Sequence, residues 1–181
     1  MNASLRGRSP VHLIRRCQQI AVALFMEETR RFGITPVQYA ALVAVQESPG
    51  IDQIGLVGRI AVDRSTAASV VERLEQKRWL RRLASREDRR KRLLSLTPAG
   101  EALLRKVESA VDRAQERILA PLSAEDRPRF MEMLERIVDL NNEESRAPVR
   151  GDRASLAAEI QRSAGRAGRS TNATGTAAFT L

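Results

Sequence analysis

Aromatic residues, cysteine and histidine are scarce in this chain of 181 residues, and each scarcity excludes something. Phe, Trp and Tyr make up 3% of the chain, so its core has to be aliphatic and rich in Ala. Cys17 is the single cysteine and His12 the single histidine, too few for a four-ligand zinc site or an internal disulfide. A catalytic triad would need His12 as its base, and no nucleophile-elbow or phosphate-loop motif accompanies it. We therefore expect no metal, no cofactor and no enzymatic activity.

Long hydrophobic runs are absent as well. No apolar stretch reaches the roughly 18 residues that a membrane span requires, and the first residues lack the hydrophobic region of a signal peptide. Together with the single cysteine, this favours a protein of the reducing cytoplasm that has no membrane partner. The length suits about one domain with a sizeable core, and an aliphatic composition suits packed helices.

Positive charge is in excess, with a net charge of +9 and a pI near 11.1. Much of it lies between residues 77 and 92, where nine basic residues meet two acidic ones. The nine are Lys77, Arg78, Arg81, Arg82, Arg86, Arg89, Arg90, Lys91 and Arg92. Such a cluster repels itself, so it favours a polyanionic partner over a basic surface that is merely solvated.

Apolar residues recur at helical spacing through most of the chain. Ser9-Pro10, Thr35-Pro36 and Thr97-Pro98 are typical helix starts, and Asp52 and Asp63 are further N-caps. The pattern predicts helices over about 10–32, 36–47, 53–60, 64–78, 97–120 and 123–140, and strands over 79–83 and 92–96 around a charged loop. This order is that of a winged helix-turn-helix: a mainly α fold with a small β-hairpin wing.

The predicted helix over 64–78 has two unlike faces. Ala67, Val70, Val71 and Leu74 share one side, and Ser65, Thr66, Ser69 and Arg73 share the other. Short hydroxyl side chains let a helix approach base edges closely, and Arg is the commonest reader of guanine. The outward face therefore favours recognition of double-stranded DNA.

Several stretches carry a family resemblance: "ITPVQYAALVAV", "VDRSTAASVVERLEQK" and "DRRKRLLSLTPAG". The last contains a specific wing signature, formed by Asp88, Arg90, Leu94, Leu96, Thr97 and Gly100. Over roughly residues 10 to 142 the chain resembles the MarR family of bacterial transcriptional regulators. It departs from the family at Arg78, where Gly is common. Because a left-handed Arg costs about 1 kcal/mol, we expect the helix end there to be shaped differently.

The resemblance implies a homodimeric repressor of a pseudo-palindromic operator. It assigns 9–34 and 97–145 to a helical dimerisation region and 35–96 to the DNA-binding lobe, with helix 64–78 in the major groove and Arg90 in the minor groove. The expected DNA contacts are Arg64, Ser65, Thr66, Ser69, Arg73, Arg86, Arg89 and Arg90. Asp88 is expected to orient a neighbouring arginine, because phosphate repels a carboxylate. Residues 146–181 are poor in large apolar groups, so we expect a disordered basic tail.

In this family a small molecule or oxidation relieves repression. On the first predicted helix, His12, Arg16 and Gln19 flank the apolar stripe in one line. We expect them to bind an anionic aromatic effector, such as an aromatic carboxylate or its coenzyme A thioester. The alternative is that this line is the solvated edge of the helix.

Three other functions stay open. Cys17 lies on the first helix, roughly where peroxide-sensing relatives carry a reactive thiol, although a free Cys in an apolar stripe is also an ordinary small hydrophobe. A non-specific architectural DNA binder would share the charge but not need the Ser/Thr/Arg face. A protein–protein adaptor would need no arginine cluster at all.

Overall fold

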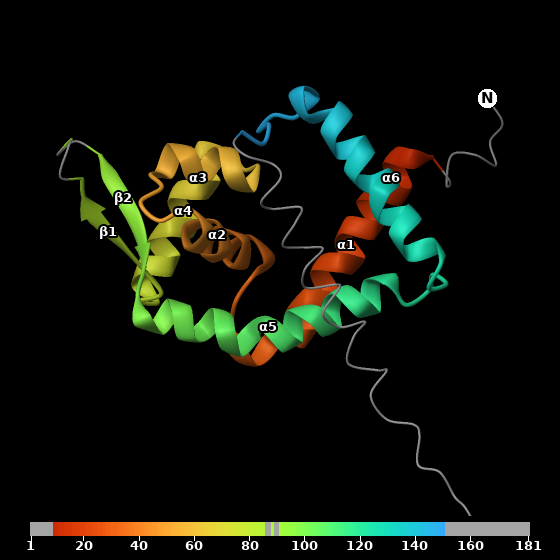
Figure 1. Ribbon diagram of the computed structural model, residues 1–181, viewed down its shortest axis with the longest axis horizontal. Helices are drawn as coiled ribbons and strands as arrows, with labels where there is room; N and C mark the ends of the chain where they lie inside the picture. Colours follow the sequence, from red (N-terminus) through yellow and green to blue (C-terminus); the bar gives the residue numbers. More distant parts are fainter. Residues whose placement is uncertain (1–8, 86–87, 89–90, 151–181) are drawn as a thin grey trace, which may run out of the picture. The chain divides into compact units, whose positions relative to one another are not determined.

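The computed structural model describes residues 9–85, 88 and 91–150. It is mainly helical with one two-stranded antiparallel hairpin, as the sequence predicts (Figure 1). The elements are α1 (Pro10–Glu28), the 3-10 turn η2 (Arg30–Phe32), α2 (Pro36–Glu47), α3 (Gln53–Ile60), α4 (Arg64–Gln76), β1 (Leu80–Ala84), β2 (Arg92–Leu96), α5 (Pro98–Leu119), α6 (Asp126–Leu140) and η3 (Asn142–Glu144). No helix in these ranges is long and apolar enough to cross a bilayer.

The predicted N-caps are present. Thr35 and Gln38 form a reciprocal capping box at α2, and the hydroxyl of Thr97 accepts a hydrogen bond from the Gly100 amide at α5. Asp52 and Asp63 accept amide hydrogen bonds at the starts of α3 and α4. Local sequence therefore fixes where these helices begin, because each cap satisfies an amide that the first turn leaves unpaired.

Three boundaries differ from the predicted ones. α1 ends at Glu28, because the buried Thr29 hydroxyl donates to the carbonyl of Phe25 and the chain tightens into η2. α4 ends at Gln76, and Trp79 belongs to its terminal turn, so β1 begins one residue later than predicted. α6 begins at Asp126, whose amide donates to the Ser123 hydroxyl in the turn before the helix.

The core lies where α2, α3, α4, β2 and α5 meet. Five residues are completely buried there, with 0% of their surface exposed: Leu42, Leu56, Leu74, Leu94 and Val107. The predicted inner face of α4 is buried throughout. Because aliphatic side chains from the other four elements pack against the inner face of α4, its opposite face is the one that reaches solvent.

The hairpin is anchored to the helices at its base. Leu80 pairs with Leu96 and Ala84 with Arg92. The amide of Leu94 also donates to the carbonyl of Ile51, at 2.8 Å. The segment before α3 therefore pairs with β2 through an isolated antiparallel bridge. The wing is therefore fixed to the lobe at one end and projects at the other (Figure 1).

α1 runs along α5 and is joined to it by ion pairs. Glu28 binds Arg113 at 3.0 Å and Arg117 at 2.8 Å, and Glu27 binds Arg117 at 3.1 Å. Although its sequence is amphipathic, no residue of α1 is fully buried, and none of α6 is either. Much of the apolar surface of both helices is thus left exposed within this chain's described part.

The segment after η3 folds back onto α3. The side-chain amide of Asn142 donates to the carbonyl of Val149 and its oxygen accepts the Val149 amide, at 3.3 and 2.8 Å. The amide of Arg150 then donates to the carbonyl of Gly58 at 2.8 Å. The tail boundary expected at residue 146 therefore falls within a hydrogen-bonded segment. The expected tail from 151 onward lies outside the described residues.

Candidate nucleic-acid interface

The outward face of α4 lines a hollow of about 290 Å³ with the start of α2. Ser65, Thr66, Ser69 and Arg73 form one wall, and Thr35, Val37 and Gln38 form the other. Ser65, Ser69 and Arg73 are exposed and Thr66 is half-buried. The structure thus brings together four of the predicted DNA contacts. It adds Val70 and, from the N-cap and first turn of α2, Thr35, Val37 and Gln38, none of which sequence reasoning assigned to DNA binding.

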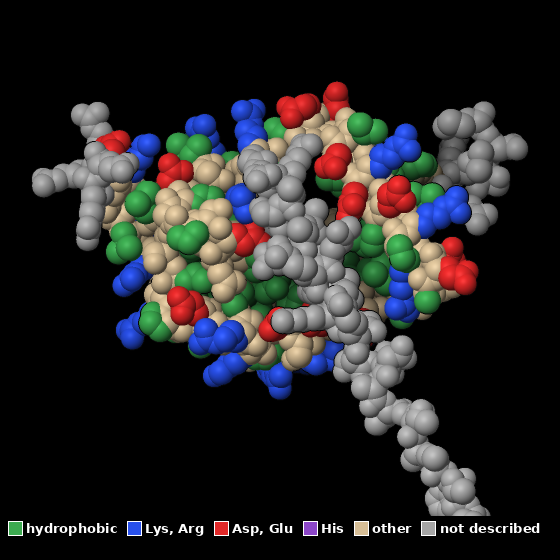
Figure 2. Space-filling view, in the orientation of Figure 1, with side chains coloured by type: hydrophobic (Ala, Val, Ile, Leu, Met, Phe, Trp, Pro, Cys, Tyr) green, Lys and Arg blue, Asp and Glu red, His purple; other side chains and the backbone are tan. Residues whose placement is uncertain are grey.

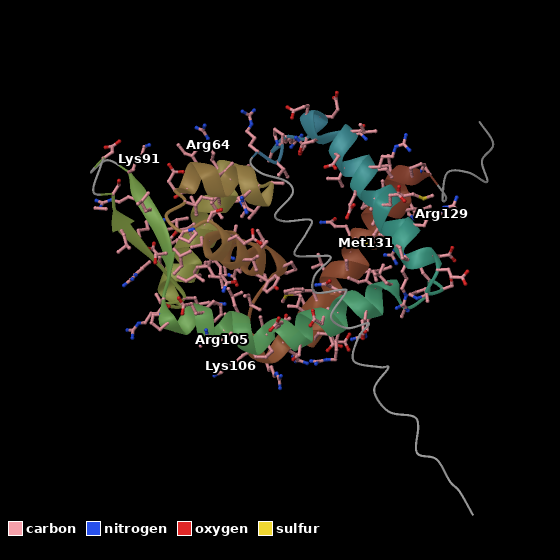
Figure 3. All side chains as sticks on the ribbon, viewed as in Figure 1. Arg64, Lys91, Arg105, Lys106, Arg129 and Met131 are labelled. Atoms are coloured by element: carbon pink, nitrogen blue, oxygen red, sulfur yellow. The ribbon has the colours of Figure 1, made fainter. Side chains whose placement is uncertain are left out.

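The two arginines of α4 are free to bind an external group. Arg64 begins the helix, is exposed and lies outside the lining of the hollow, while Arg73 lines it. Within the described part of the chain, neither guanidinium makes a hydrogen bond or an ion pair. In Figure 3, Arg64 and Lys91 of the wing extend outward, whereas Arg105 and Lys106 of α5 extend at a different edge of the view.

Asp63 organises the first turn of α4. Its carboxylate accepts hydrogen bonds from the hydroxyls of Ser65 and Thr66, at 2.5 and 2.6 Å, and from the Thr66 amide at 2.9 Å. The Ser65 and Thr66 hydrogen bonds hold the pKa of Asp63 well below its usual range. Sequence reasoning identified the cap but missed these side-chain contacts, for which the Asp-x-Ser-Thr spacing was the available signal.

Two members of the basic cluster have structural partners. Lys77 donates to the carbonyl of Gly33 at 2.5 Å, and its ammonium lies 4.5 Å from the centre of the Trp79 ring. Arg82 binds Glu75 at 3.0 Å across the base of the wing. The cluster is therefore less available to a polyanion than its sequence suggests. Figure 2 shows Lys and Arg side chains from the described part of the chain as a whole, spread around the rim of the face in view.

The turn that ends α4 contains a residue with a left-handed backbone conformation, although that residue is Arg78 and not the Gly that is common in the family. Arg78 has φ of 57°, its amide donates to the carbonyl of Glu75, and the amide of Trp79 donates to that of Leu74. These two bonds form a Schellman motif. The expectation of a differently shaped end at Arg78 is thus wrong. The motif and the 2.6 Å bond from the Thr97 hydroxyl to the Arg78 carbonyl hold the strained residue in place.

The wing tip is described only in part. Arg86, Arg89 and Arg90 lie outside the described residues, so their DNA contacts stay predictions. Asp88 is half-buried; its amide donates to the Ser85 hydroxyl and its carbonyl accepts the Lys91 amide. The turn is closed by these bonds. The proposed orienting role of the Asp88 carboxylate is untested.

The predicted effector residues lie on α1. The amide of His12 is capped by the Ser9 hydroxyl, and the guanidinium of Arg16 donates to the Gln19 side-chain oxygen at 3.3 Å. Arg16 and Gln19 are exposed and adjacent. None of the three lines the hollow beside α4, so any effector site on α1 is separate from the candidate DNA surface.

Known proteins share the sequence pattern and the fold of this chain. The MarR family model matches residues 34–91. A protein of Thauera aromatica, named as a transcriptional regulator for the hcr operon, is 34% identical over 144 residues, which cover 79% of this chain and 86% of that protein.

Two solved structures share the fold. The PcaV regulator from Streptomyces coelicolor, in complex with its natural ligand, has 32% identity and a TM-score of 0.66, covering 77% of this chain and 96% of that one. BpsR of Bordetella bronchiseptica, whose DNA binding is regulated by 6-hydroxynicotinic acid, has 27% identity and a TM-score of 0.70, covering 74% and 96%. The Thauera and Streptomyces relatives are named as transcriptional regulators. The chain belongs to the MarR family of transcriptional regulators.

Proposed function

We propose that this protein is a homodimeric repressor that binds a pseudo-palindromic operator and leaves it when an aromatic acid or its acyl-CoA thioester binds. The observation that carries the proposal is the outward face of α4. Free Arg73 and three hydroxyl side chains line a hollow there, with an opposing wall from α2. In the proposed complex, α4 enters the major groove and Arg73 reads a guanine edge.

Arginines around this helix have a second role in the proposal. Arg64, Arg86 and Arg89 contact phosphates, which fix register without reading sequence. Arg90 enters the minor groove, where narrow A·T-rich DNA concentrates negative potential. A bacterial operator lies in the cytoplasm, so the proposal places the protein there.

The uncovered apolar faces of α1 and α6 support the dimer. Exposed side chains on these helices are Val11, Leu13, Ile14, Ile20, Val22, Met26, Met133, Ile137, Val138 and Leu140. This many large apolar side chains left exposed on two helices is typical of an interface with another chain. A two-fold axis through it would set the two α4 helices about one DNA turn apart, so that half-sites are about 10 bp between centres.

The effector class rests on the relatives and on α1. BpsR responds to 6-hydroxynicotinic acid and PcaV was captured with its natural ligand. On this chain, Arg16 offers an exposed cation beside His12, and the apolar side chains of α1 offer a surface for a ring. The Arg16–Gln19 hydrogen bond is solvent-exposed, so an anionic ligand displaces it at little cost.

The DNA part of the proposal is tested with Arg73→Ala. An operator is first selected from randomised DNA, and binding to it is compared with binding to random DNA at physiological salt. Loss of a base contact is expected to weaken operator binding by about 1–3 kcal/mol and random-DNA binding much less. Arg105→Ala on α5 is the matched control, because it removes the same charge away from α4. Equal losses on both DNAs, or no selected sequence, contradict base reading and favour the architectural binder.

The effector part is tested by titrating aromatic acids and their thioesters against the operator complex. Wild type is expected to release DNA at a ligand concentration that leaves Arg16→Ala bound. Arg15→Ala, on the other flank of the helix, is the control. Release of Arg16→Ala at the wild-type concentration would remove Arg16 from the site and leave the family assignment intact.

Redox sensing is the second candidate, because the Cys17 thiol is exposed. Against it, peroxide-sensing relatives use tyrosines to polarise the thiol, whereas Tyr39, the chain's only tyrosine, packs on Phe25 with ring centres 5.8 Å apart. Phe25 lies eight residues beyond Cys17, about 12 Å further along α1, so the phenol is remote from the thiol. Peroxide release of DNA by wild type but not by Cys17→Ser would establish this alternative.

A further inference from the structure

The hydroxyls of Ser65 and Thr66 both donate their protons in hydrogen bonds to the Asp63 carboxylate. The Ser65 oxygen lies 2.5 Å from one carboxylate oxygen and the Thr66 oxygen 2.6 Å from the other. An ionised carboxylate can only accept hydrogen bonds, so both hydroxyls must donate to it. The lowered pKa of Asp63, caused first by the Ser65 bond and then by the Thr66 bonds, keeps the carboxylate ionised at neutral pH.

A hydroxyl has one proton and two lone pairs. With their protons held by Asp63, Ser65 and Thr66 can meet a DNA base only as hydrogen-bond acceptors. Both side chains line the hollow on the outward face of α4. Ser69, one turn further along, makes no hydrogen bond through its side chain within the described residues. The Ser69 hydroxyl can therefore act as a hydrogen-bond donor or as an acceptor toward a base.

We propose that Asp63 determines the base preference of α4, by making Ser65 and Thr66 acceptors that select amino-bearing bases on one DNA strand. In the major groove, adenine N6 and cytosine N4 carry amino donors, whereas thymine O4 and guanine O6 are acceptors. Two oxygen acceptors repel each other, so G and T are rejected at the positions that these side chains face. The inference rests on the proposed function, because it assumes that α4 lies in the major groove.

The test starts from operators selected out of randomised DNA by the full-length protein. Ser65→Ala and Thr66→Val locate the contacted positions, because base preference there should collapse while the rest of the selected sequence persists. At those positions, on one strand, wild type is expected to favour A or C over G or T by about tenfold, the discrimination expected of a hydrogen bond to a base edge.

Asp63→Asn is the decisive variant. Asn caps a helix about as well as Asp, but it offers one acceptor oxygen and an amino donor in place of two acceptor oxygens. At least one hydroxyl then recovers its proton and can donate to G or T. The preference for amino bases at the located positions should fall to about threefold or less, and the preference at the Ser69 position should not change.

Asp52→Asn is the matched control. Asp52 caps α3 by accepting the Gly55 amide at 2.8 Å, and no hydroxyl of the described residues bonds to its carboxylate. The same loss of charge at a neighbouring cap should leave every base preference as in wild type. Unfolding midpoints of both variants check that the helices are intact.

The possible outcomes separate the two proposals. If wild type selects no sequence, the proposed function fails. If wild type selects a sequence but shows no amino preference at the located positions, or if Ser65→Ala and Thr66→Val locate none, the role of Asp63 is overturned and the proposed function stands. An amino preference that survives Asp63→Asn, or that Asp52→Asn abolishes equally, also overturns it.

Discussion

The backbone of Gly100 lies directly against the backbone of Trp79: a Cβ at position 100 would come within 2.1 Å of the Trp79 carbonyl oxygen. That oxygen cannot move away easily, because it accepts the Thr97 amide at 3.1 Å. The first turn of α5 is therefore seated on the chain that enters the wing. The contact explains physically why the sequence needs Gly three residues after Thr97.

Gly100→Ala is expected to destabilise the protein by about 3 kcal/mol, because backbone rather than a flexible side chain must give way. Equilibrium unfolding in urea at fixed protomer concentration measures the loss. Gly33→Ala is the control: φ is +61° there but nothing lies within 4 Å of the added Cβ, so only about 1 kcal/mol of backbone strain is expected. Equal losses at both positions would contradict the steric account.

Arg78→Gly is expected to stabilise the protein relative to Arg78→Ala. Position 78 has φ of 57°, and Gly adopts this conformation without the penalty, about 1 kcal/mol, that Ala and Arg carry. Comparison with Ala separates backbone strain from loss of the guanidinium. The measurement is the difference in free energy of unfolding between the two variants. A Gly variant no more stable than the Ala variant would show that the strain is relieved some other way.

Ile20→Glu is expected to disrupt the proposed dimer. Ile20 is 48% exposed on the apolar face of α1, and a carboxylate placed in an apolar interface loses its hydration without a partner. The dimer dissociation constant, from sedimentation equilibrium, should rise at least about 30-fold. Ile54→Glu, at a 69% exposed isoleucine of α3, should not change it. If both variants dimerise as wild type does, the interface lies elsewhere.

Glu28→Gln is expected to alter the acid dependence of stability. Hydrogen bonds from Arg117, and then from Arg113, lower the pKa of Glu28 below its ordinary value of 4.5. A lowered folded-state pKa means that its stabilising contribution is complete above about pH 4.5 and is lost as the pH falls through the folded value. The variant should be less stable than wild type at pH 7.

The difference between Glu28→Gln and wild type should shrink as unfolding is measured at successively lower pH below 4.5. Glu72→Gln, at an exposed acid on α4, is the control and should show no such convergence. If the difference in free energy of unfolding between Glu28→Gln and wild type stays constant as the pH falls, the Glu28 charge does not stabilise the packing of α1 on α5.

Local pattern was sufficient for most of the secondary structure. Side-chain periodicity separated the two faces of α4, and the buried face holds as predicted from Ala67 to Leu74. Cap residues located the starts of α2, α3, α4 and α5, because a cap acts within three or four residues of itself. Helix ends were predicted less well, since the Thr29 hydroxyl and the Trp79 amide end their helices by donating to backbone carbonyls, and apolar periodicity does not register such bonds.

The sequence by itself determined the helical fold, the wing, the polar face of α4 and the family, because periodicity, caps and motifs act over short separations. Only the tertiary structure decided which polar groups are free. In the folded chain, the Lys77 ammonium donates a hydrogen bond to the carbonyl of Gly33, 44 residues away, and is less available to a polyanion. The fold also pairs Arg82 with Glu75 and lines one hollow with residues of α2 and α4. It brings the Arg150 amide within hydrogen-bond distance of the Gly58 carbonyl. These contacts depend on how helices pack against one another, and a side chain's partner across such a junction is set by that packing and not by its spacing in the sequence.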